Sequence, residues 1–312
     1  MKKIMTVTLN PAVDKTYTTQ GVIVGNVNRM RTAVKIAGGK GVNVTKILRQ
    51  YGYDVAATGF LGGYSGRFIE EELIKRGAEC RFIHVAGETR SNMNILADDG
   101  YVTEILEPGP VVSAEEKEAF LVQYDEILSE CGLVILSGSV AQGVDVGIYE
   151  TLIRRAADLS VPVYLDSSAE SLCLGMRAKP QMIKPNWREL EYIMGRRIVG
   201  RAQVIEAAQL LCSEGISRVV VSMGSKGLVS VTEDGVLYAR TTGIIPVNTV
   251  GCGDSVVASY AMSYLDGESE EQAIVRACAI SAANATTAES GNIPLETAKD
   301  LLNKIIVEKS DA

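Results

Sequence analysis

The sequence has little of several residues and patterns on which whole classes of protein depend. A single histidine, His84, occurs among 312 residues, which excludes catalysis by a histidine pair and a metal site built from several histidines. No two of the six cysteines form a C-x-x-C pair, so they indicate reduced, cytosolic thiols rather than a disulfide framework. No apolar run reaches the ~18 residues that a membrane span needs. The N-terminal segment is interrupted by Asn10 and Pro11, so we do not expect it to be a signal peptide.

Positive charge is also scarce. Lys and Arg number 31 against 38 for Asp and Glu, so the formal net charge is −7. An acidic chain without a basic block is a poor candidate for binding nucleic acid, and an anionic substrate would have to meet a local basic cluster. With 46% apolar and 22% charged residues, the composition is that of a cytoplasmic globular protein with a sizeable core.

Short β-rich apolar runs alternate with helical patterns, and no linker or low-complexity tract divides the chain. The expected strands are Met5–Leu9, Val55–Phe60, Leu133–Leu136, Val161–Leu165, Gln181–Ile183 and Arg218–Ser222. The expected helices are Val42–Tyr51, Gly66–Arg76, Ala114–Leu128, Gly147–Leu159, Val204–Cys212 and a final group at Ser255–Leu265, Glu270–Ala288 and Leu295–Val307. This alternation predicts βαβ units and a mainly parallel sheet covered on both faces.

Two regions depart from the alternation. Residues 15–36 have a Thr/Val-rich β pattern without a helix. Residues 92–106 indicate a hairpin that turns at Asp98-Asp99-Gly100, where glycine supplies the positive φ of the turn. Both regions could belong to one small sheet that stands off the main sheet. A further hairpin is expected to turn at Asp234-Gly235.

Two common nucleotide-binding fingerprints are absent. The pattern G-x-x-x-x-G-K-[ST] fails because Lys40 is followed by Gly41. The pattern G-x-G-x-x-G fails after Gly251 and Gly253 because its last position is Val256. A Walker P-loop and a Rossmann dinucleotide fingerprint are therefore unsupported, which disfavours a nucleotide-dependent oxidoreductase.

The segment Asn248–Ser255 (NTVGCGDS) runs directly into a predicted helix. Two glycines before a helix let backbone N–H groups converge, and the helix N-terminus adds partial positive charge, which suits an oxyanion or a phosphate. Asp254 lies beside this cradle, where a carboxylate is unfavourable unless it accepts a proton from the nucleophile that attacks the phosphate. Alternatively, Gly251 and Gly253 form a tight turn and Asp254 caps the helix. This motif alone does not choose between the two interpretations.

Two further motifs have both a functional and a structural interpretation. Ala37–Val44 (AGGKGVNV) opens a helix, and Lys40 and Asn43 could hold a polyol or its phosphate, although such a helix start is more often structural. In the motif KPNWRE, Asn186 and Glu189 have the spacing of a capping box. The same pair could instead organise a water-ligated Mg²⁺, an ion that prefers few direct protein ligands.

Further candidates lie where strands are expected to end, the edge at which open α/β sheets bind ligands. They are the SGS motif at 137–139 and Asp166, while the SMG motif at 222–224 could border a nucleotide. Arg29 and Arg90 are basic residues in or beside the two non-alternating regions. Together the motifs supply a phosphate cradle with a carboxylate base, a separate polar pocket and a candidate Mg²⁺ organiser.

In this order, the motifs resemble those of the ribokinase-like (PfkB) family of carbohydrate kinases. Gly38–Gly63 is similar to the first signature of the family and Thr249–Ser255 (TVGCGDS) to the second. TLNPAVD, VNR, GETR, SGS, KPNWREL and SMGSKG also follow the family's order, so the resemblance covers essentially the whole chain. It implies an α/β fold of ribokinase-like, three-layer α/β/α type with a mainly parallel central sheet. The kinase domain would span residues 1–312, with a small β-sheet lid formed by about 15–36 and 90–108.

The resemblance implies transfer of the ATP γ-phosphate to a sugar hydroxyl, with ATP and Mg²⁺ as cofactors. It makes Asp254 the base, and assigns the anion hole to the backbone of Gly251, Cys252 and Gly253. The implied substrate-binding residues are Asp254, Asp14, Gly39, Lys40, Asn43 and Ser139, with Arg29 and Arg90 near the substrate phosphate. The implied ATP-binding residues are Lys184, Asn186, Ser222, Gly224, Gly227, Thr249, Gly251, Gly253 and Asn284. Asn186 and Glu189 match the family's N-x-x-E motif, which manages Mg²⁺ here through water.

Lys40 stands in a G-G-K-G form similar to that of the family's phosphosugar branch. The implied substrate is therefore fructose 1-phosphate, giving fructose 1,6-bisphosphate, with tagatose 6-phosphate as the alternative. Cys252 replaces the family's usual alanine, and Ser91–Asn94 matches neither subgroup's usual sequence. A non-catalytic sugar-phosphate sensor is disfavoured, because a pure binder gains nothing from Asp254. A homodimer through the lid is expected, because a small sheet has an open edge to cover.

Overall fold

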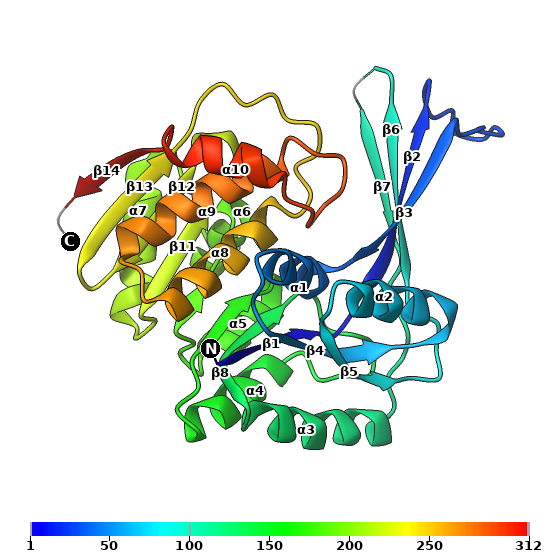
Figure 1. Cartoon of the computed structure of the whole chain (residues 1–312), viewed down its shortest axis with the longest axis horizontal. Coiled ribbons are helices and arrows are strands. Elements are labelled where there is room, and N and C mark those ends of the chain that lie inside the picture. The colour runs from blue at the N-terminus through cyan, green and yellow to red at the C-terminus, as the bar shows by residue number, and fades with distance from the viewer. Residues whose placement is uncertain (1, 100, 311–312) are drawn as a thin grey trace.

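The computed structural model describes residues 2–99 and 101–310, and its larger sheet has ten strands (Figure 1). These are β1 (Lys3–Thr8), β4 (Val55–Leu61), β5 (Glu79–His84), β8 (Cys131–Ser137), β9 (Val163–Asp166), β10 (Met182–Ile183), β11 (Arg218–Ser222), β12 (Leu228–Thr232), β13 (Gly235–Arg240) and β14 (Ile306–Ser310). Their order is β14-β13-β12-β11-β10-β9-β8-β1-β4-β5. The strands from β5 to β11 run parallel, and those from β11 to β14 pair antiparallel.

Helices cover both faces of this sheet, which confirms the expected α/β architecture. One layer contains α1 (Lys40–Gln50), α8 (Cys252–Asp266), α9 (Glu270–Asn284) and α10 (Leu295–Leu302), with α2 (Gly63–Lys75) beside α1. The other contains α3 (Ala114–Leu128), α4 (Ile148–Asp158), α5 (Ala169–Met176), α6 (Trp187–Met194) and α7 (Gly200–Ser213). In β1, Ile4 packs in the core of the first layer and Met5 and Val7 in that of the second, as the two-residue period of a strand requires. No helix in the described part of the chain combines the length and apolar character of a membrane span.

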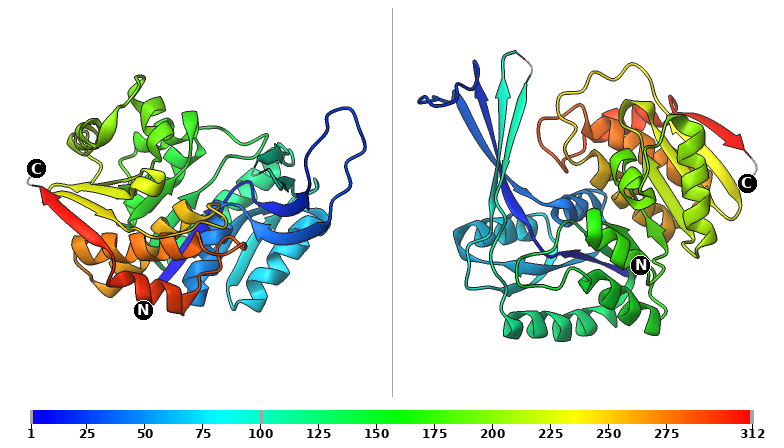
Figure 2. Two further views of the ribbon diagram at one scale, coloured as in Figure 1. Left: turned by 90° about the horizontal axis from the view of Figure 1, so that it is seen from above. Right: turned by 180° about the vertical axis from the view of Figure 1, so that it is seen from behind.

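A smaller four-stranded sheet stands away from the rest of the molecule (Figures 1 and 2). Its strands are β2 (Ala12–Thr19), β3 (Thr32–Gly38), β6 (Ser91–Ala97) and β7 (Val102–Leu106), in the order β3-β2-β6-β7. The two non-alternating regions therefore form one sheet, as predicted, and we call this sheet the lid. Several of its apolar side chains are exposed, as are those of the loop between β2 and β3: Val22, Ile23, Val24, Val27, Val34, Ile105 and Leu106.

Two of the expected helices extend too far. The helix expected over Leu295–Val307 is wrong in its second half, because α10 ends at Leu302 and Ile306–Ser310 forms β14. The open edge of β13 offers this β-branched segment a complete antiparallel ladder, which outweighs its helical spacing. The helix expected to reach Ala288 ends at Asn284.

Both expected hairpins join antiparallel neighbours. Leu228–Thr232 and Gly235–Arg240 meet at the predicted Asp234-Gly235 turn, where Thr232 pairs with Gly235. Strands β6 and β7 are likewise antiparallel, although Gly100 of their expected turn lies outside the described residues.

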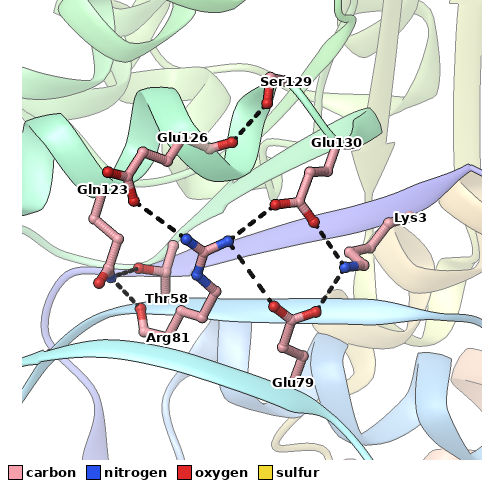
Figure 3. A network of polar contacts seen from close by, with 8 residues as sticks. All are labelled: Lys3, Thr58, Glu79, Arg81, Gln123, Glu126, Ser129 and Glu130. Atoms are coloured by element: carbon pink, nitrogen blue, oxygen red, sulfur yellow. Dashed lines mark hydrogen bonds and ion pairs between the residues drawn. The ribbon is translucent and has the colours of Figure 1, made fainter.

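The edge strand β5 has no counterpart in the sequence prediction, and a network of charged side chains joins it to its neighbours (Figure 3). Lys3 Nζ lies 2.6 Å from a carboxylate oxygen of Glu79 and 3.0 Å from one of Glu130. Arg81 lies 3.2 Å from Glu130 and 3.3 Å from Glu126. A single solvent-exposed ion pair contributes little to the stability of the fold, but this set of pairs links β1, β5 and the end of α3.

Candidate active site

One cavity of about 1260 Å³ lies between the lid, the carboxyl ends of the strands β8 to β11 and the N-terminus of α8. The carboxyl ends of parallel strands meet at one edge of a sheet, which is why residues distant in sequence converge there. Most predicted site residues line the cavity: Asp14, Gly39, Lys40, Asn43, Arg90, Ser139, Lys184, Asn186, Ser222, Gly224, Gly227, Thr249, Gly251, Cys252, Gly253 and Asp254. Three predicted site residues are not among its lining: Arg29, Glu189 and Asn284.

Asp254 lies in the first turn of α8 and is only 5% exposed. Asn43 Nδ2 donates to Asp254 Oδ2 at 2.8 Å, which ties the glycine-rich start of α1 to this carboxylate. Burial raises the pKa of Asp254 to about 6, and the negative charge of Asp166 acts in the same direction. A carboxyl group with this pKa is ionised at neutral pH and still accepts a proton readily.

The turn before α8 has the conformation that the Gly-x-Gly spacing predicts. Gly251 is the N-cap residue with φ +83°, in the left-handed region that favours glycine. A Cβ atom on Gly253 would lie 3.1 Å from Lys184 Nζ, so this ammonium group packs directly against the loop. The Cys252 amide donates to Thr249 O at 3.3 Å, a long hydrogen bond that an incoming oxyanion could replace.

Two lysines converge on Asp166, which follows directly on the predicted strand Val161–Leu165. Asp166 Oδ1 lies 2.9 Å from Lys40 Nζ and 3.5 Å from Lys184 Nζ. Burial alone would raise the pKa of Asp166, but the two ammonium groups outweigh it and hold this pKa below its usual value. Among the described residues, Asp166 Oδ2 is buried without a hydrogen-bond partner. The position of Asp166 at the end of an expected strand made it a candidate from the sequence. Only the structure shows that it pairs with both lysines.

On the lid side, Asp14 is held by a residue that the sequence did not single out. Asn92 Nδ2 donates to Asp14 Oδ1 at 3.0 Å, and burial raises the pKa of Asp14. Asn92 and Asn94 both line the cavity, as does Glu104, the partner of Asn94 across β6 and β7. The i, i+2 spacing of the two asparagines on an expected strand is the signal that could have found them. Two more residues of the lining that were not predicted are Asn10 and Arg188.

The two arginines predicted near a substrate phosphate lie apart in this chain. Arg90 lines the cavity, and its guanidinium donates to the backbone carbonyls of Asn10 at 3.0 Å and Glu107 at 3.2 Å. Arg29 is exposed in the loop between β2 and β3, and it is not part of the cavity lining.

Asn186 and Glu189 form the capping box that their spacing predicts. Asn186 Oδ1 accepts from the Glu189 amide at 2.9 Å, and Glu189 Oε2 accepts from the Asn186 amide at 2.8 Å. Glu189 Oε1 also lies 3.7 Å from Lys40 Nζ. Within residues 2–99 and 101–310, no cluster of three or more His, Cys, Asp or Glu side chains could hold a metal ion by itself.

Asn284 supports the loop before α8 from behind. Its Nδ2 donates to Val250 O at 2.9 Å, and its Oδ1 accepts from the Gly291 amide at 3.1 Å. The side chain is fully buried, so in this structure it holds backbone rather than facing the cavity.

The family model of the pfkB family carbohydrate kinases matches residues 4–298. The chain is 34% identical over 308 residues to a tagatose-6-phosphate kinase of Staphylococcus epidermidis, covering 97% of this chain and 99% of that one. It superposes with a TM-score of 0.89 on a structure from Thermotoga maritima named a possible 1-phosphofructokinase, with 30% identity over 99% of this chain and 100% of that one. The TM-score is also 0.89 for the tetrameric inhibited form of phosphofructokinase-2 from Escherichia coli, with 26% identity over 97% and 99% of the chains. The chain therefore belongs to the PfkB family of carbohydrate kinases, which use ATP and transfer phosphate to an alcohol group.

Proposed function

We propose that this chain transfers the γ-phosphate of ATP to a hydroxyl group of a ketose phosphate. The substrate is fructose 1-phosphate and the product is fructose 1,6-bisphosphate. The observation that carries the proposal is the position of Asp254: a buried carboxylate with a pKa of about 6, at the N-terminus of α8, bonded to Asn43. The residues assigned to the phosphate cradle, the base and the polar pocket all line one cavity, which supports the proposal.

In this reaction the O6 hydroxyl of the sugar attacks the γ-phosphorus. The new O6–P bond forms as the bond from phosphorus to the β,γ-bridging oxygen breaks, ADP leaves, and the hydroxyl proton passes to Asp254. Phosphoryl transfer depends mainly on positioning and on stabilising the charge of the transferred group. The helix N-terminus with Gly251 and Gly253, and the ammonium groups of Lys184 and Lys40, are suited to that charge.

The substrate's own phosphate needs a separate positive group. Among the arginines that line the cavity, Arg90 is the one at the lid. Lys40 lies instead beside Asp166 and Lys184. We therefore assign the fixed phosphate of the sugar to Arg90, with Lys40 between that phosphate and the transferred one. Asp14 and Asn43 are the proposed partners of the sugar hydroxyls, beside Gly39 and Ser139.

The nucleotide is proposed to lie against the ends of β10 and β11 and the loop before α8. The residues assigned to it there are Lys184, Asn186, Ser222, Gly224, Gly227, Thr249, Gly251 and Gly253, with Asn284 supporting the loop. Mg²⁺ is the proposed companion of ATP, and the donor set fits it: Asp166 Oδ2 has no partner among the described residues, and Glu189 Oε1 lies nearby at 3.7 Å from Lys40. Asp166, Asn186 and Glu189 would hold the ion partly through water, and the ion would neutralise phosphate charge.

Tagatose 6-phosphate is a second candidate, favoured by the 34% identity to the kinase of Staphylococcus epidermidis. ADP release measured with fructose 1-phosphate, tagatose 6-phosphate, fructose 6-phosphate and free fructose separates the candidates. The highest kcat/KM with fructose 1-phosphate supports the proposal, and the highest value with tagatose 6-phosphate replaces it by the second candidate. Turnover with none of the phosphorylated sugars overturns both.

We further propose that two copies associate through the lid. Within the described part of the chain, no further strand pairs with the outer edges of β3 and β7, and apolar residues such as Val34, Ile105 and Leu106 remain exposed on the lid. Because Arg29 is not part of the cavity lining of its own chain, its predicted role near the sugar phosphate requires a second copy or a movement of its loop. Light scattering of the purified protein tests this: a dimer supports the proposal, and a monomer at assay concentration overturns it.

We also propose that residues 1–312 act as one kinase domain in the cytoplasm. Its six cysteines are free thiols, which suits a reducing compartment.

A further inference from the structure

Lys46 is a buried lysine that no step of the proposed reaction uses. It lies on α1, and its side chain is among the largest in the described chain to be fully buried, at 1% exposure. Its ammonium group donates to the backbone carbonyls of Ala37 at 2.8 Å and Ser290 at 2.7 Å. These two carbonyls belong to segments that are some 250 residues apart in sequence, so the side chain of Lys46 joins distant parts of the chain.

The Ala37 carbonyl belongs to the segment Ala37–Gly39, which we call the lid root. Ala37 pairs with Val13 in the lid, and the strand β3 ends one residue later. The next residue, Gly38, packs so closely on the Asp14 carboxylate that a Cβ atom there would collide with it. A bond to Ala37 O therefore fixes the backbone beside the proposed sugar site.

The Ser290 carbonyl belongs to the loop between α9 and α10, which supports the segment Thr249–Gly253, here called the phosphate loop. A Cβ atom on Gly251 would lie 3.1 Å from Ser290 Cβ and 3.3 Å from the Gly291 nitrogen. Gly291 in turn packs on α1, since a Cβ atom there would lie 2.7 Å from Lys46 Cε and 3.0 Å from Asn43 Oδ1. A bond to Ser290 O therefore fixes the support of the proposed phosphate site.

Burying an ammonium group at this position costs free energy. Among the described residues, no carboxylate lies within ion-pair distance of Lys46, and burial lowers the pKa of Lys46 to about 8. The positive charge of Arg76 lowers this pKa further, while Glu289, Asp14 and Asp254 oppose the change. An apolar side chain of the same length would fill the space without that cost. What it would lack is the pair of donors that reaches both carbonyls.

Resting on the proposed function, we propose that Lys46 is a positioning residue that fixes the lid root relative to the phosphate loop. It touches neither the proposed sugar nor the proposed nucleotide. Its two bonds set the distance between the sugar held near Asp14 and the phosphate held near Gly251, and so place the attacking hydroxyl relative to that phosphate. Because reaction rates fall steeply when reacting atoms are misplaced, the residue acts on turnover more than on the binding of either substrate alone.

The test compares Lys46→Met, which keeps the length but removes the donors, with Lys46→Arg, which keeps donors. Trp187, the only tryptophan, lines the cavity, so its fluorescence is the probe for binding of ATP alone and of fructose 1-phosphate alone. Lys46→Met is expected to bind each substrate nearly as the parent protein does and to lose about 10²-fold in kcat. Lys46→Arg is expected to recover most of that loss. Lys299→Met, at an exposed lysine of α10, is the matched control and should change neither quantity.

Two results overturn the proposal: a folded Lys46→Met protein with the parent's kcat, or one whose single-substrate affinities fall as much as its kcat. If Lys46→Met does not fold, Lys46→Gln replaces it, because glutamine keeps N–H donors but is too short to reach both carbonyls. A kcat for Lys46→Gln equal to that of Lys46→Arg then overturns the proposal. Failure of the proposed function gives a different result, since the parent protein would itself turn over no sugar phosphate.

Discussion

Replacing Asp254 by asparagine removes the proposed base while keeping a side chain of nearly the same size. Asn43 can still donate to the new amide oxygen, so the contact that now measures 2.8 Å is preserved. A general base contributes typically about 10²–10⁴-fold to turnover. We expect a loss of that size in kcat, with the KM for ATP little changed, because the side chain acts on the attacking hydroxyl and not on the nucleotide.

The pH profile of the parent protein should follow the same carboxyl group. With a pKa of about 6, Asp254 is a base above that pH and is protonated below it. The value of kcat/KM should therefore fall about tenfold for each pH unit below 6 and level off above about 7. The residual activity of Asp254→Asn should lack this limb of the profile.

The same substitution should stabilise the fold. The pKa of Asp254 is about 6 when folded against an ordinary value of 3.8, so the buried charge costs roughly 3 kcal/mol above pH 6. A carboxyl whose pKa rises on folding destabilises the folded state above its folded pKa, and this cost disappears as pH falls from about 6 to below 3.8. Asp254→Asn should thus raise Tm by about 5 °C at pH 7.5 and by less at pH 5.

Steady-state ADP release and thermal melting on the same preparations test both consequences. Asp14→Asn is the matched control, because it changes another buried carboxylate of the cavity and should raise the KM for the sugar instead. Near-normal kcat in a folded Asp254→Asn protein would remove Asp254 from the mechanism. A Tm that falls at pH 7.5 would refute the reasoning about its buried charge.

Three further substitutions test other parts of the site. Glu189→Gln should raise the Mg²⁺ concentration needed for half activity. A purely structural capping box predicts an unchanged Mg²⁺ dependence and little change in stability, because glutamine also completes a capping box, so a Mg²⁺ titration beside a melting curve decides. Arg90→Ala should cost about 10- to 150-fold in kcat/KM with a phosphorylated sugar and little with free fructose, and equal losses on both would contradict its role. Cys252→Ala should retain activity and abolish inactivation by thiol reagents. Because burial raises the pKa of the Cys252 thiol, inactivation of the parent protein should become faster as the pH rises. A parent protein that resists thiol reagents would refute the expectation.

The alternation of strands and helices was predictable because each element carries its own period in the sequence. The phosphate loop was predictable for a similar reason, since the Gly-x-Gly spacing before a helix is a local feature. The C-terminal segment was not: Leu295–Val307 has a helical spacing, but the second half pairs with the edge of β13, which the local sequence does not reveal. The edge strand β5 likewise owes its place to neighbours rather than to a strong pattern of its own.

Within the site, the sequence indicated residue types but not their partners. Lys40 and Asp166 lie 126 positions apart, and only the fold brings their side chains to 2.9 Å. Lys46 lies within the helix expected over Val42–Tyr51, and nothing in the local sequence shows that its ammonium group meets the carbonyl of Ser290. Arg29, chosen from a motif, is not among the residues that line the cavity, since the β2–β3 loop carries it to the exposed end of the lid.

The most direct test of the central proposal is the ³¹P spectrum of the product formed from fructose 1-phosphate and ATP with Mg²⁺. We predict a second phosphomonoester signal on the sugar, at C6, growing in step with ADP and about 10²–10⁴-fold more slowly with Asp254→Asn. Inorganic phosphate as the only new signal, or no transfer to fructose 1-phosphate while another sugar phosphate is converted, would contradict the account.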